Sequence, residues 1–80
     1  MKTIRIYVDS NSTDAEGRLV LTTVGGRRDL EAHTEALREG LEVIFYMTGE
    51  FEVRGTLTFD GRWLGLPDWN TIKYEEDAPE

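Results

Sequence analysis

The chain has 80 residues, a formal net charge of −7 and no cysteine, and a chain of this length builds one small core rather than two. The acidic balance disfavours contact with a phosphate backbone, so we expect no nucleic-acid partner, and the lack of cysteine excludes disulfides, thiol nucleophiles and thiolate metal sites. No apolar run approaches the roughly 20 residues of a membrane span, and the N-terminus lacks the apolar block of a signal peptide, so we expect a cytoplasmic protein that does not bind membranes.

The N-terminal third predicts two strands. Apolar and more polar residues alternate in IRIYVD, residues 4–9, the period of a strand with one buried face. The polar segment 9–17 predicts a mobile connection. The segment RLVLTTV, residues 18–24, predicts a second strand, but its leucines and its valines lie on opposite faces, which leaves its buried face open.

One short helix is predicted near residues 29–39, where leucine and alanine recur at helical spacing. Gly25 and Gly26 are expected to end the second strand before it. Asp29 is the expected N-cap, and Gly40 is the expected stop.

The next two segments predict the strongest strand pair. A three-residue loop at 48–50 brings the apolar faces of LEVIFYM, residues 41–47, and FEVRGTLTF, residues 51–59, together. The predicted pairs are Met47 with Phe51, Phe45 with Val53, Val43 with Gly55, and Leu41 with Leu57. A two-residue loop would place buried positions opposite exposed ones along the whole pair. Gly55, in mid-strand, predicts a bulge or sharp bend.

A turn at Asp60-Gly61 predicts a further hairpin of two-residue loop length. That length pairs Thr58 with Trp63 and so directs the indole of Trp63 away from the core, whereas a longer, bulged turn would reverse its direction. In PDWN, residues 67–70, the proline predicts a helical turn, from which Trp69 folds back over one end of the core. TIKY, residues 71–74, predicts a closing strand.

These elements predict a mainly β (α+β) fold, a small antiparallel barrel of five to six strands with one short helix. RWLGLPDWNTIKY, residues 62–74, resembles the end of an SH3-like barrel, and the resemblance covers about residues 53–74. The front of the chain lacks the Ala-Leu-Tyr-Asp-Tyr type segment of SH3 domains, so proline-rich ligand binding is not implied. A β-grasp is the alternative for residues 1–47. We expect residues 1–74 to form a single domain and the acidic residues 75–80 to be disordered.

No catalytic, metal or cofactor site is predicted. The only histidine, His33, has no nearby serine and there is no cysteine, which favours a surface role. The segment 9–20 begins like a calcium-binding EF-hand loop, but Asp14 and Val20 replace the required glycine and glutamate. The segment 25–28, Gly-Gly-Arg-Arg, lacks the spacing and the lysine of a phosphate-binding loop.

The remaining candidate is an aromatic and aliphatic patch. Trp63, Tyr46 and Ile44 are expected on the outer faces of neighbouring strands, with Trp69 nearby, where they would bind a protein partner or a second copy of the chain. In the competing interpretation the predicted helix covers this face. A second functional hypothesis is an acidic inhibitor or antitoxin-like protein whose carboxylates occupy a basic partner surface.

Overall fold

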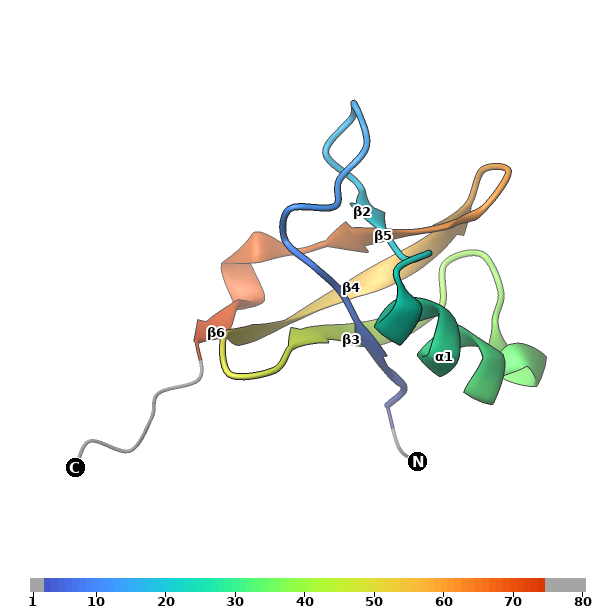
Figure 1. The fold of residues 1–80 in the computed structure, drawn as a ribbon, viewed down its shortest axis with the longest axis horizontal. Helices are drawn as coiled ribbons and strands as arrows, with labels where there is room; N and C mark the ends of the chain where they lie inside the picture. Colours follow the sequence, from blue (N-terminus) through green and yellow to red (C-terminus); the bar gives the residue numbers. More distant parts are fainter. Residues whose placement is uncertain (1–2, 75–80) are drawn as a thin grey trace.

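The structure, a computed structural model that describes residues 3–74, is a curled half-barrel sheet of six strands with one α-helix (Figure 1). The predicted disordered tail at 75–80 lies outside the described residues. The strands are β1 (Arg5–Tyr7), β2 (Leu19–Val20), β3 (Glu42–Met47), β4 (Phe51–Phe59), β5 (Trp63–Pro67) and β6 (Lys73–Tyr74). The helices are α1 (Val24–Ala32) and the 3₁₀ turns η1 (Thr34–Ala36) and η2 (Trp69–Thr71).

The strands follow the order β1-β3-β4-β5-β2, and β6 pairs with β4. This arrangement confirms the predicted mainly β class, a small SH3-like barrel with one short helix. One pair differs from the antiparallel expectation, because β1 and β3 run parallel. The connection between them carries α1, as a parallel pair requires a long crossover. A β-grasp would pair β1 with β2, whereas here they lie at opposite ends of the strand order.

The predicted register of β3 and β4 is confirmed. Val43 pairs with Gly55, Phe45 with Val53, and Met47 with Phe51. The loop between them has three residues, and its central glycine, Gly49, has a φ of 78°, a conformation that favours glycine. The inward side chains of both strands are therefore in phase, and the core forms between them.

The ring of Phe45 lies against the backbone of two glycines on neighbouring strands. A Cβ atom at Gly55 would lie 2.7 Å from Cε2 of Phe45, and one at Gly65 would lie 2.6 Å from its Cζ. Phe45 is fully buried. The missing side chains of Gly55 and Gly65 thus leave the room that this ring fills, and β4 changes its pairing from β3 to β5 around Gly55.

The helix spans Val24–Ala32 instead of about 29–39, so the predicted N-cap Asp29 and the predicted stop Gly40 are wrong. Thr23 is the N-cap, and its Oγ1 accepts a hydrogen bond of 3.1 Å from the Gly26 amide. A Cβ atom at Gly26 would lie 2.5 Å from the Leu21 carbonyl oxygen and 3.0 Å from that of Tyr7. The glycine pair therefore lies in the first turn of α1, which fits between two strand ends where a side chain has no room, and the second strand already ends at Val20.

The first two strands and their connection are shorter and better defined than predicted. Only Leu19–Val20 of the second predicted strand joins the sheet, and Leu19 and Leu21 are fully buried, which settles the face left open above. The segment before it forms a hydrogen-bonded hairpin, in which Asp14 accepts from the amide and guanidinium of Arg18 at 2.8 and 2.6 Å.

The β4–β5 hairpin corrects the position of Trp63. Its loop has three residues, 60–62, since Phe59 pairs with Trp63 and Thr58 with Leu64. Asp60 lies outside the ladder and pairs with Arg18 at 3.3 Å. The extra residue turns Trp63 to the side of the sheet opposite to the predicted one. Its half-buried indole therefore packs against the core cluster.

Glu39 caps the edge of β4 that faces β3, beyond the point where β3 begins. Its carboxylate accepts from the Phe59 amide at 2.9 Å and from the Thr58 hydroxyl at 2.7 Å. The hydrogen bond from the Phe59 amide, followed by that from Thr58, lowers the pKa of Glu39 below its ordinary value of 4.5. This contact satisfies a strand edge that would otherwise be open to pairing.

No helix in the part of the chain that the structure describes is long and apolar enough to cross a membrane.

We expect Gly65→Ala to destabilise the fold by about 1–3 kcal/mol, because the added methyl overlaps the Phe45 ring. In a Phe45→Leu background the same change should cost less, since the smaller side chain vacates that space. Urea denaturation of the wild type, both single variants and the double variant measures this coupling. Strictly additive costs would show that the ring and the glycine are not in contact.

We expect Glu39→Gln to change the acid sensitivity of the fold. A carboxyl group whose pKa is lowered by folding stabilises the fold above its unfolded pKa, and that contribution is lost as the pH falls through the folded pKa. Between about pH 5 and pH 3 the free energy of unfolding should therefore fall more steeply for the wild type than for Glu39→Gln. Parallel urea-denaturation profiles for the two proteins would contradict this role.

Candidate interaction surface

Side chains that point away from the core on three adjacent strands form what we call the outer face. They alternate with the buried residues of the same strands, as the two-residue period requires. The outer face comprises Arg5 and Tyr7 on β1, Glu42, Ile44 and Tyr46 on β3, and Glu52, Arg54 and Thr56 on β4.

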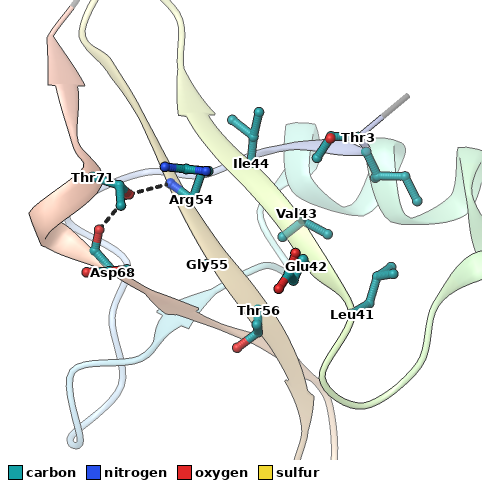
Figure 2. A pocket seen from close by; sticks show the side chains of 11 residues that line it. Thr3, Leu41, Glu42, Val43, Ile44, Arg54, Gly55, Thr56, Asp68 and Thr71 are labelled. Carbon is teal, nitrogen blue, oxygen red and sulfur yellow. Dashed lines mark hydrogen bonds between the residues drawn. The ribbon is translucent and has the colours of Figure 1, made fainter. Parts of the chain in front are cut away.

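A hollow of about 630 Å³, the outer groove, lies over this face (Figure 2). Ile44, Glu42 and Arg54 line it from the strands, Thr3 lies at the β1 side, and η2 contributes the opposite side through Asp68 and Thr71. A second hollow of about 370 Å³ shares Ile44, Arg54 and Thr71 with it and extends along β4 towards β6.

Hydrogen bonds fasten η2 to β4 at the side of the groove. The Thr71 hydroxyl accepts from the Arg54 amide at 3.0 Å and donates to the Asp68 carbonyl at 2.7 Å (Figure 2). The Asp68 amide in turn donates to the Arg54 carbonyl at 2.8 Å. The backbone around Arg54 is therefore held in place while its guanidinium remains exposed.

Two of the charges on the outer face neutralise each other and two do not. Arg5 pairs with Glu52 at 2.9 Å, and its guanidinium lies 4.8 Å from the centroid of the Tyr46 ring. Glu42 and Arg54 are exposed, and neither forms an ion pair with another residue of the 3–74 segment. The outer groove thus carries one carboxylate and one guanidinium free for an external partner.

Asp29, on α1, covers the far end of the outer face. Its Oδ2 accepts from the Tyr7 amide at 2.9 Å and from the Tyr46 hydroxyl at 3.1 Å. The Tyr7 and Tyr46 rings meet edge to face, with centroids 5.7 Å apart. Burial, followed by the hydrogen bond to Asp29, raises the pKa of the Tyr46 phenol above its ordinary value of 10.0. Tyr46 is therefore engaged within the fold.

The four predicted partner-binding residues do not form one patch. Ile44 lies in the outer groove and Tyr46 on the same face. Trp63 lies at the β4–β5 hairpin, with its ring 5.1 Å from that of Phe59. Trp69 lies on η2 and packs edge-on against Phe51, a core residue, at 6.1 Å. That contact agrees with the prediction that Trp69 folds back over one end of the core.

Sequence reasoning missed the charged members of the groove, Glu42 and Arg54. A signal for them was present, since the predicted register of β3 and β4 already placed Arg54 opposite Ile44. Thr71 and Asp68 carried no such signal, because η2 reaches β4 only through the tertiary fold.

The other predicted motifs have structural explanations. The segment 25–28 lies within the N-terminal half of α1. In the segment 9–20, which begins like a calcium-binding loop, Asp9 accepts from the Asn11 amide at 2.9 Å, and Asp14 is paired with Arg18. Among residues 3–74 no group of three histidine, cysteine or acidic side chains is placed to hold a metal ion.

Comparison with known proteins gives no match for this chain, whether with protein-family models, curated proteins or solved structures.

We expect Tyr46→Phe to reduce the sensitivity of the fold to alkali. A phenol whose pKa is raised by folding contributes stability that is complete below its unfolded pKa and is lost as the pH rises through the folded pKa. Above about pH 10 the wild type should therefore lose more stability than Tyr46→Phe. Thermal unfolding of both proteins between about pH 8 and pH 11 measures the difference, and equal losses would exclude a raised pKa at Tyr46.

Proposed function

We propose that this chain is a non-catalytic protein-interaction module of the cytoplasm, or a small self-associating subunit, that binds through the outer groove. One observation carries the proposal. Glu42 and Arg54, two exposed and opposite charges, flank the half-buried aliphatic side chain of Ile44 within a single hollow of about 630 Å³. An apolar centre with a polar rim is the usual composition of a protein interface.

The chemistry of the groove supports binding over catalysis. Within the described part of the chain, its lining contains no histidine, serine, cysteine or lysine. The Asp68 carboxylate is engaged in capping η2, where it accepts from the Asn70 amide at 3.1 Å. A nucleophile paired with an oriented base, the usual arrangement for covalent catalysis, is not assembled by these residues.

Charge supports this face over the rest of the surface. The outer face carries two arginines and two glutamates, whereas the whole chain carries a net charge of −7. The segment 75–80 alone holds four of the sixteen acidic residues. An acidic partner therefore meets less repulsion at the outer face, where two arginines and two glutamates cancel, than the net charge of the whole chain implies.

The acidic segment supports a second candidate, an inhibitor or antitoxin-like protein that occupies a basic partner. Binding of that kind would weaken steeply with added salt. It would also depend on residues 75–80 and not on Ile44.

We expect Ile44→Glu to weaken partner binding strongly without loss of the fold. Arg5 and Arg54 lie on either side of Ile44 across the neighbouring strands, so a glutamate there has two compensating charges while the apolar contact is lost. Val24→Glu is the matched control, because it makes the same charge change on α1 at a side chain that is 76% exposed.

The measurement is affinity capture from the source cells with wild type and both variants, followed by titration of the purified partner. Val24→Glu should bind like the wild type, and Ile44→Glu should bind at least about tenfold more weakly. Equal binding by all three proteins would exclude the outer groove as the site.

A further inference from the structure

We infer that the partner at the outer groove is a second copy of this chain, in an isologous dimer that places Glu42 of each copy on Arg54 of the other. This inference rests on the proposed function, since it uses the same groove and names its occupant. It follows from the positions of four outward side chains on β3 and β4.

These four side chains form a rectangle. Glu42 lies opposite Thr56, and Ile44 lies opposite Arg54. Successive outward residues are about 6.6 Å apart along a strand and neighbouring strands are about 4.8 Å apart, so the two diagonals cross at a steep angle. Glu42 and Arg54 occupy one diagonal, and Ile44 and Thr56 occupy the other.

A twofold axis along the Ile44–Thr56 diagonal makes this face complementary to itself. The rotation brings Glu42 of one copy over Arg54 of the second and Arg54 of the first over Glu42 of the second. It also leaves Ile44 facing its own symmetry mate at the apolar centre. Isologous interfaces require this reciprocity, in which one residue contacts another and the second contacts the first.

Internal contacts leave these charges free for such a dimer. Arg5 and Glu52, the other charged pair of the outer face, neutralise each other within one chain at 2.9 Å. Glu42 and Arg54 form no ion pair within residues 3–74. A second copy supplies an arginine for Glu42 and a glutamate for Arg54. The two acidic chains also meet at a face whose two arginines and two glutamates cancel.

Charge reversal tests the reciprocity. Glu42→Arg alone places two arginines in each contact, and Arg54→Glu alone places two glutamates there, so each single variant should dimerise at least about tenfold more weakly than the wild type. The double variant Glu42→Arg, Arg54→Glu restores both pairs and should dimerise like the wild type. An equimolar mixture of the two single variants should form a heterodimer for the same reason.

Sedimentation velocity from about 1 μM to about 1 mM, a range that covers weak dimers, measures these equilibria, and thermal unfolding confirms that each variant folds. Recovery of the dimer in the double variant cannot arise from misfolding of the single ones. A wild type that stays monomeric throughout, or a dimer insensitive to single reversal, would overturn the inference. In that case capture of a different protein that depends on Ile44 would still support the proposed function.

Discussion

The fold depends on one contact, the ring of Phe45 against the backbone of Gly55 and Gly65. A flat sheet offers no enclosed space for a phenyl ring, but two glycines on neighbouring strands remove the methyl groups that would otherwise fill it. β4 can then pair with β3 along its first half and with β5 along its second. The two glycines therefore allow both the curl of the half-barrel and the burial of Phe45, its largest fully buried side chain.

The edges of this curled sheet are closed by single polar residues and one helix turn. The first turn of α1 fits between the carbonyls of Tyr7 and Leu21 at Gly26, Asp29 accepts the Tyr7 amide, and Glu39 accepts the amide of Phe59. The two hydrogen bonds each satisfy a backbone amide that could otherwise pair with another chain. Association through these two strand edges is thereby restrained.

Local sequence signals predicted the fold well where they agreed with long-range packing. The β3–β4 register followed from alternation in both strands, because a two-residue loop would have set Phe45 opposite Glu52. Gly25 and Gly26 were misinterpreted because helix propensity disfavours glycine. The close approach of Gly26 to the backbone of Tyr7 and Leu21 depends on the tertiary fold and leaves no local signal in the sequence. The Asp60-Gly61 turn was misinterpreted for a similar reason. This dipeptide is a strong signal for a two-residue hairpin loop, but Asp60 contacts Arg18, 42 residues away in the sequence.

The candidate site was predicted only where it depended on the β3–β4 register. Ile44 was placed correctly, but Trp63 moved to the core side when the next loop gained a residue. The same register also determines the outer face, because fixing Val43 opposite Gly55 fixes Glu42 opposite Thr56 and Ile44 opposite Arg54. A slip of one residue would destroy the core and the rectangle together. A packed interior around Phe45 therefore also fixes the relative positions of the four outward side chains.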